Sequence, residues 1–311
     1  MNLETFSFEK AISLKAMESP FFSAANSLNF LLGGDLSINR LGYGAMRLTG
    51  QPGNFGPYAD WEGGKQLLHH AVDRGVTFID TAEAYGPGHN EEIIADALYP
   101  YPAGLVIATK GGINKPAPDN IQADGRPESL RQGVEGSLRR IKLERIDLYQ
   151  LHRPDPKVPF AESIQALAEL QQEGKIRHIG VSNVTLDQLK EADAIAPITS
   201  VQNRYSLLDR THEAILNYCI AHQIAFIAYG PLAAHPLRPG SPLVEAEGTL
   251  REIANAHNMS PTQIALAWLL HRASNILLIP GTTSIAHLEE NLASATISLS
   301  QSEFQQLNNL G

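Results

Sequence analysis

Short apolar runs of strand length alternate along the chain with longer amphipathic segments, and this alternation occurs eight times. Each run is followed by a turn and then by about ten to fifteen residues with helical periodicity. Such a rhythm is typical of a parallel sheet that is covered by helices. It predicts an α/β protein of the (β/α)₈, or TIM-barrel, class. The eight runs are Ile38–Gly44, Thr77–Thr81, Leu105–Thr109, Ile146–Leu151, Ile176–Val181, Ser200–Gln202, Ala225–Ala228 and Ile276–Ile279.

Several helix ends can be predicted from capping residues. Helices over about Trp61–Arg74 and Phe160–Glu173 are expected to end at Gly75 and Gly174, because glycine is favoured just after a helix. The segment Ser260–Gln263 has the spacing of a capping box with proline in the first turn, which predicts a helix start there.

Additional elements are expected at both ends of the barrel. Leu28–Ser37 has the pattern of a β-hairpin with a Gly33-Gly34 turn, which would plug the barrel floor. A last helix is expected over roughly Ser300–Leu310. We therefore predict a single domain over residues 26–311, preceded by an N-terminal extension of unknown role over residues 1–25.

Composition and charge narrow the range of partners and compartments. The 311 residues are 43% hydrophobic and 18% charged, with a formal net charge of −9, so nucleic acid and anionic membranes are poor partners. The longest apolar stretch, Ile264–Leu270, is too short to span a bilayer, and residues 1–25 lack the features of a signal or transit peptide. We expect a cytoplasmic protein, either monomeric or weakly homo-oligomeric. The single cysteine, Cys219, excludes an intrachain disulfide and is expected to be a buried thiol.

Four polar residues stand at or just after the ends of three successive predicted strands. Asp80 ends the second run, with Tyr85 five residues later, while Lys110 and His152 follow the third and fourth runs. The carboxyl ends of barrel strands meet at one mouth, where active sites form. Taken alone, Asp80 could be a helix cap and Tyr85 a loop aromatic. Together the four residues are typical of a general acid with its tuning partners.

These residue types suit the reduction of a carbonyl group, which needs a proton donor for the oxygen. Tyr85 would be that donor, with its pKa lowered by the Lys110 ammonium. Asp80 would keep Lys110 charged and oriented. His152 would hydrogen-bond the carbonyl oxygen and orient the substrate.

Three motifs that contain these residues resemble the signatures of the aldo-keto reductase family. They are Gly75–Gly86, Ile107–Lys110 and Ile146–His152. The resemblance extends over nearly the whole chain, from about Asn39 to Leu307. It implies a (β/α)₈ barrel in which Asp80, Tyr85, Lys110 and His152 form the catalytic tetrad.

The same resemblance implies an NADPH site at the barrel mouth. Ser182, Asn183 and Gln202 match residues that bind the nicotinamide amide, and Tyr229 matches the aromatic that stacks on its ring. Ser182 and Asn183 alternatively cap the next helix, and Glu290 and Asn291 alternatively belong to a solvated helix face. The complete set of expected cofactor contacts is Gly44, Met46, Arg47, Asp80, Ser182, Asn183, Gln202, Tyr229, Gly230, Pro231, Leu232, Gly281, Thr282, Thr283, His287, Glu290 and Asn291.

Two positions depart from the family pattern for binding the 2′-phosphate of NADPH. Many members have lysine or arginine where this chain has Gly281, and arginine where it has His287. Thr282, Thr283 and the amides near Ser284 would have to replace them. We expect NADPH, with NADH as a possible alternative.

A small-molecule carbonyl compound is the expected substrate. Tyr58, Trp61 and residues 233–242 would line its pocket together with Tyr85 and His152, and Ile38–Arg47 is similar to bacterial pyridoxal reductases of the family. An alternative is an NADPH-binding regulatory subunit with little turnover. A metal-dependent barrel is disfavoured because His69-His70 is the only pair suggestive of a metal site. No Gly-x-Gly-x-x-Gly loop supports a Rossmann domain.

Overall fold

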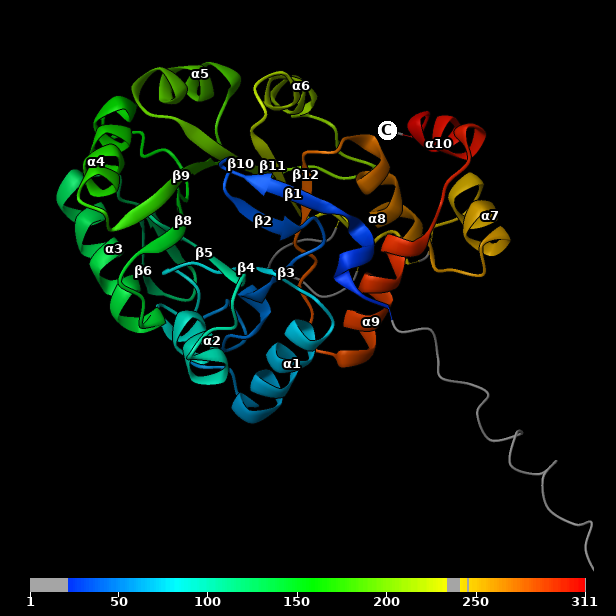
Figure 1. Cartoon of the computed structure of the whole chain (residues 1–311), viewed down its shortest axis with the longest axis horizontal. Helices are drawn as coiled ribbons and strands as arrows, with labels where there is room; N and C mark the ends of the chain where they lie inside the picture. Colours follow the sequence, from blue (N-terminus) through cyan, green and yellow to red (C-terminus); the bar gives the residue numbers. More distant parts are fainter. Residues whose placement is uncertain (1–21, 234–240, 245, 311) are drawn as a thin grey trace, which may run out of the picture.

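A computed structural model of the chain, which describes residues 22–233, 241–244 and 246–310, contains a closed barrel of parallel strands (Figure 1). The eight strands are adjacent in the order β3-β4-β5-β8-β9-β10-β11-β12. A parallel bridge between Leu41 and Leu278 closes the barrel, and the amide of Gly42 donates to the carbonyl of Leu278 at 2.8 Å. The predicted fold class is confirmed. The strands are β3 (Tyr43–Gly44), β4 (Phe78–Asp80), β5 (Val106–Gly111), β8 (Ile146–Leu151), β9 (Ile176–Ser182), β10 (Ile198–Arg204), β11 (Ala225–Tyr229) and β12 (Ile276–Leu278).

Helices surround the barrel, and the capping residues place their ends as predicted. Ser260 and Gln263 form the expected capping box, while Gly75 and Gly174 follow their helices with φ of 81° and 79°. The last helix covers the expected segment. The helices are α1 (Trp61–Asp73), α2 (His89–Leu98), α3 (Pro127–Ile141), α4 (Phe160–Gln172), α5 (Leu186–Ile195), α6 (Glu213–Ala221), α7 (Thr249–Ala256), α8 (Pro261–Arg272), α9 (Ile285–Ala293) and α10 (Gln301–Asn308), with 3₁₀ turns at Ala24–Ser27, Ala45–Arg47 and Ser294–Thr296.

The N-terminal hairpin closes the amino end of the barrel, as expected. Strands β1 (Asn29–Leu32) and β2 (Leu36–Asn39) are antiparallel, and Leu32 and Ile38 share a buried cluster with Phe78 and other side chains of the barrel interior. Figure 1 shows this hairpin lying across the barrel. The predicted first strand, Ile38–Gly44, was wrong in its start. Its first two residues pair within the hairpin, and only Tyr43–Gly44 joins the barrel as a strand, because hydrogen bonds from Asn39 to Thr77 and Gly75 hold the chain at the barrel floor.

A second hairpin was not predicted. Strands β6 (Ile113–Ala117) and β7 (Asn120–Ala123) are antiparallel and extend from the carboxyl end of β5, where the barrel opens. Its sequence signal is weak: the alternation of buried Ile113 and Lys115 with exposed Asn114, followed by a turn around Asp119. This hairpin adds residues to the mouth of the barrel.

None of the helices in the described residues is long and apolar enough to cross a membrane. The described residues also contain no group of three or more His, Cys, Asp or Glu side chains with the arrangement of a metal site. Cys219 is fully buried, as predicted.

Candidate active site

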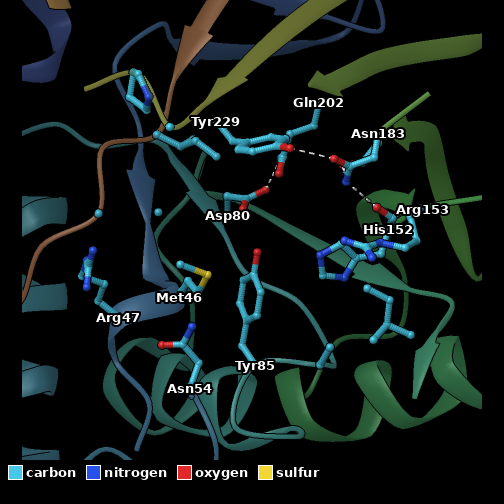
Figure 2. A pocket seen from close by; sticks show the side chains of 18 of the residues that line it. Met46, Arg47, Asn54, Asp80, Tyr85, His152, Arg153, Asn183, Gln202 and Tyr229 are labelled. Atoms are coloured by element: carbon cyan, nitrogen blue, oxygen red, sulfur yellow. Dashed lines mark hydrogen bonds between the residues drawn. The ribbon is translucent and has the colours of Figure 1, made fainter. Parts of the chain in front are cut away.

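A cavity of about 350 Å³ opens at the carboxyl ends of the barrel strands. It brings together residues from almost every strand end and from the β6–β7 hairpin (Figure 2). All four predicted tetrad residues are present: Asp80, Tyr85 and His152 line the cavity, and Lys110 lies directly behind them. The remaining lining residues are Gly44, Met46, Arg47, Asn54, Ala84, Ile113, Lys115, Ile121, Arg153, Ser182, Asn183, Gln202, Tyr229, Gly230, Pro231, Leu232, Ile279, Pro280 and Gly281.

Asp80 and Lys110 form a buried ion pair. Lys110 Nζ lies 2.6 Å from Asp80 Oδ1 and 2.8 Å from the carbonyl oxygen of Thr81, and the lysine is 0% exposed. The other carboxylate oxygen accepts from Gln202 Nε2 at 2.7 Å. Burial by itself lowers the pKa of Lys110, but Asp80 and Tyr85 outweigh it, so that the pKa is raised. The pair is therefore a fixed, charged dipole beside Tyr85.

The Tyr85 hydroxyl is within reach of this ammonium. Lys110 Nζ donates to the Tyr85 oxygen at 3.4 Å, and the Nζ lies 5.0 Å from the centre of the tyrosine ring. The sequence suggested a lowered pKa for Tyr85. That expectation was wrong for this site, because burial raises the pKa of Tyr85 more than Lys110 lowers it. Tyr85 therefore keeps its proton at neutral pH, and Lys110 limits the cost of losing it.

His152 lies edge-on to Tyr85, with ring centres 5.7 Å apart. Burial, followed by the charges of Lys110, Arg153 and Lys115, lowers the pKa of His152 well below its usual 6.5. Its imidazole is thus neutral at physiological pH. Its Nδ1 is buried and has no hydrogen-bond partner among the described residues. A buried polar atom of this kind is typical of a site that a ligand or water completes.

Three polar side chains form a connected group on the β9–β11 side of the cavity. Asn183 Nδ2 donates to the His152 carbonyl at 2.9 Å and to Ser182 Oγ at 3.0 Å, while the Tyr229 hydroxyl donates to Asn183 Oδ1 at 2.8 Å. The cap of helix α5 is Thr185, so Ser182 and Asn183 do not have the alternative capping role. A carboxamide and two hydroxyls held in this way suit the recognition of an amide ligand.

The ends of β3 and β12 approach each other so closely that only glycine fits there. A Cβ on Gly44 would lie 2.5 Å from the carbonyl oxygen of Ile279, and one on Gly281 would lie 2.8 Å from the carbonyl oxygen of Gly44. The absence of lysine or arginine at Gly281 therefore has a structural cause. Met46, Arg47 and the segment 230–232 line the cavity on the same side.

The expected contacts beyond Gly281 lie outside the cavity, on and before helix α9. Thr282 is buried and its carbonyl accepts from Tyr43, whereas Thr283, His287 and Glu290 are exposed. Asn291 is 9% exposed, so it does not belong to a solvated helix face. These residues continue the surface from Gly281, and their role in holding a cofactor stays a prediction.

The structure does not bring Tyr58 and Trp61 into the site. Neither is among the described residues that line the cavity. Tyr58 packs against the hydrophobic core near Gly64, and Trp61 Nε1 donates to Asp96 Oδ2 at 2.9 Å, which joins α1 to α2. We correct their predicted place accordingly. Of the expected pocket segment 233–242, residues 234–240 lie outside the described residues.

Several lining residues were missed by sequence reasoning: Asn54, Ala84, Ile113, Lys115, Ile121 and Arg153. Arg153 could have been found, because it directly follows His152 in the sequence. Lys115 and the two isoleucines could not, because their place depends on the unpredicted β6–β7 hairpin.

The fold and the site define a (β/α)₈ barrel protein with a buried ion pair, a tyrosine and a histidine at the carboxyl ends of its strands. Comparisons with known proteins agree. The aldo/keto reductase family model matches residues 40–311. The pyridoxine 4-dehydrogenase of Escherichia coli (strain K12) is 41% identical over 274 residues, which cover 86% of this chain and 93% of that protein.

Solved structures also match over most of the chain. A thermostable aldo-keto reductase has a TM-score of 0.79 at 34% identity and covers 91% of this chain and 100% of its own. An aldo-keto reductase from Klebsiella pneumoniae in complex with NADPH has a TM-score of 0.76 at 30% identity, with 91% and 94% coverage. The chain belongs to the aldo/keto reductase family.

Proposed function

We propose that this protein is an NADPH-dependent reductase that converts small aldehydes or ketones to alcohols, with Tyr85 as the proton donor. The observation that carries the proposal is the arrangement of Asp80, Lys110 and Tyr85 as a connected chain that ends at a cavity beside a neutral His152. A proton donor of this kind is what carbonyl reduction requires.

The side chains fit NADPH as the partner of the reaction. A bound nicotinamide would supply the hydride to the carbonyl carbon. Ser182, Asn183 and Gln202 would hold its amide, since Gln202 uses its Nε2 on Asp80 and keeps its Oε1 as an acceptor. Gly44 and Gly281 line the cavity without side chains, so a ligand there would lie against the backbone. The NADPH complex of the Klebsiella pneumoniae relative supports this assignment.

The acid–base groups of the chain would complete the reduction. Tyr85 would pass its proton to the carbonyl oxygen, and the phenolate left behind would be stabilised by the Lys110 ammonium 3.4 Å away. Neutral His152 would donate a hydrogen bond to the same oxygen and so position the carbonyl. Asp80 would keep Lys110 charged throughout.

Pyridoxal is the first substrate to test, because the Escherichia coli relative is a pyridoxine 4-dehydrogenase. The experiment follows NADPH oxidation by the wild-type protein and by Tyr85→Phe. The phenylalanine variant keeps the ring but loses the acid, so we expect kcat to fall by at least about a hundredfold while the Kd for NADPH changes little.

Two outcomes would contradict the proposal. Turnover of Tyr85→Phe near the wild-type rate would show that another group is the acid. Tight NADPH binding without oxidation, across aldehydes and ketones, would favour a regulatory subunit instead. Phe226→Leu, within the core and away from the mouth, is a control for packing changes alone.

A further inference from the structure

The cavity is positively charged, although the chain as a whole is acidic. Arg47, Lys115 and Arg153 line it, with Lys110 directly behind the lining, whereas Asp80 is the only acidic residue among the described residues that line it. Asp80 is paired with Lys110 at 2.6 Å, so its charge is not available to Lys115 or Arg153. Lys115 and Arg153 therefore add positive charge at one mouth of a chain whose formal net charge is −9. Charge concentrated in a cleft attracts a ligand of the opposite sign.

Lys115 is a buried cation without a carboxylate partner among the described residues. It is 7% exposed, and its ammonium donates to the carbonyls of Gly53 at 2.5 Å and Asn54 at 2.9 Å. These two bonds fix the ammonium in place and use two of its three N–H groups. Lysine is rarely buried unless it is paired, which points to an anion that arrives with the ligand.

Arg153 provides a second cation on the same side of the cavity. Its guanidinium is exposed and makes no ion pair or side-chain hydrogen bond within the part of the chain that the structure describes. Figure 2 shows Arg153 beside His152, with Arg47 on the opposite side of Tyr85. Arg153 and Lys115 both act electrostatically on His152, so the two charges lie near one imidazole.

The two cations come from the part of the rim formed by β5 and β8, and Arg153 borders the proposed cofactor site, because it follows His152, whose carbonyl accepts from Asn183. Lys115 is on β6, which follows β5, and Arg153 follows β8. Apart from Asp80 on β4, the proposed cofactor residues that line the cavity stand at the ends of β9, β10, β11, β12 and β3, on the adjoining part of the barrel rim. The apolar side chains of Ala84, Ile113 and Ile121 also line the cavity. The substrate side thus combines an apolar wall with two cations.

We propose that the substrate is an anionic carbonyl compound: a compact apolar body that carries a carboxylate or phosphate, which Arg153 and Lys115 bind while the carbonyl faces Tyr85 and His152. The inference rests on the proposed reductase function and narrows its substrate class. Arginine pairs with either anion in a bidentate manner, and the buried ammonium adds a charge-assisted hydrogen bond.

The test compares charged and neutral substrates of the same shape. One pair is 4-formylbenzoate and its methyl ester, and the other is pyridoxal 5′-phosphate and pyridoxal. We expect kcat/KM to be at least about tenfold higher for one charged member than for its neutral partner. The pair that shows the preference identifies the anion as carboxylate or phosphate.

Arg153→Gln should reduce that ratio by about tenfold, mainly through KM, because the anion would lose its bidentate partner. Arg145→Gln is the matched control, since Arg145 is also exposed but precedes β8 at the opposite end of the barrel. It should leave the ratio unchanged. Lys115→Met should reduce the ratio in the same direction as Arg153→Gln. An unchanged melting temperature of this variant would indicate loss of the anion site, whereas a lowered one would indicate loss of the hydrogen bonds to the Gly53 and Asn54 carbonyls.

The same ratios are to be measured as Kd by calorimetry for the four compounds, so that binding is tested even without turnover. No preference for either charged member, in Kd and in kcat/KM, would overturn the inference and leave the reductase function standing. A preference in Kd that Arg153→Gln does not change would also overturn it. A preference in Kd with no turnover would instead support the anion site and contradict the reductase function.

Discussion

Replacing Asp80 with asparagine tests whether the buried ion pair is as strongly coupled as its geometry indicates. The variant keeps the shape of the side chain and an acceptor oxygen, but removes the negative charge that faces the Lys110 ammonium, which is 0% exposed. Two unit charges 2.6 Å apart attract by about 6 kcal/mol at an effective dielectric constant of about 20. Part of this is offset because the carboxylate no longer has to be desolvated, so we expect the free energy of unfolding to fall by about 3–5 kcal/mol at pH 7.

The pH dependence of this loss is the sharper part of the prediction. In the wild type, the raised pKa of Lys110 means that its stabilisation is fully present below 10.5, the ordinary value, and is lost only above it. Without Asp80, burial lowers the pKa of Lys110 below 10.5, so the unfolded variant binds more protons than the folded variant in that window. The stability of the variant then rises with pH, by up to about 1.4 kcal/mol per unit, and the gap to the wild type narrows.

The assay is urea unfolding of both proteins at pH 7 and pH 9.5, followed by fluorescence of Trp61 and Trp268. Asp119→Asn, at an exposed position in the β6–β7 turn, is the control and should change stability by less than about 0.5 kcal/mol. A loss below about 1 kcal/mol at pH 7, or a loss that is equal at the two pH values, would refute the reasoning.

Two further predictions concern the cofactor surface and the thiol. His287 lies on the exposed face of α9, and His287→Arg should lower the Kd for NADPH by roughly fivefold to tenfold, because arginine pairs with a phosphate. The Kd for NADH should not change in the same fluorescence titrations. An equal effect on both cofactors would place the 2′-phosphate elsewhere. Burial raises the pKa of Cys219 to about 12. Ellman's reagent at pH 8 should therefore detect no thiol in the native protein and one thiol after denaturation. A rapid reaction of the native protein would contradict the buried position.

Much of the fold followed from local sequence patterns. Apolar runs separated by amphipathic segments determined the barrel class, because strands buried on both faces need continuous apolar residues. Capping residues determined where helices end, as at Gly75 and Ser260, since these are local hydrogen-bonding and backbone preferences. The position of Asp80, Tyr85, Lys110 and His152 at the barrel mouth was also predicted from the sequence, because each stands at or after the end of a strand whose carboxyl end opens there.

Other features were decided only by the tertiary structure. Trp61 is an aromatic residue after the first strand and was therefore expected in the pocket. The packing of α1 on α2 instead turns its indole toward Asp96. The pKa of Tyr85 depends on burial as much as on Lys110, and burial is a property of the assembled barrel. Lys115 faces the cavity because it lies on the β6–β7 hairpin at the barrel mouth. The local sequence gives only a weak indication of that hairpin. The sequence specifies helices and strands through interactions between residues a few positions apart. The orientation of Trp61, the pKa of Tyr85 and the position of Lys115 depend instead on contacts between distant segments, which meet only when the barrel closes.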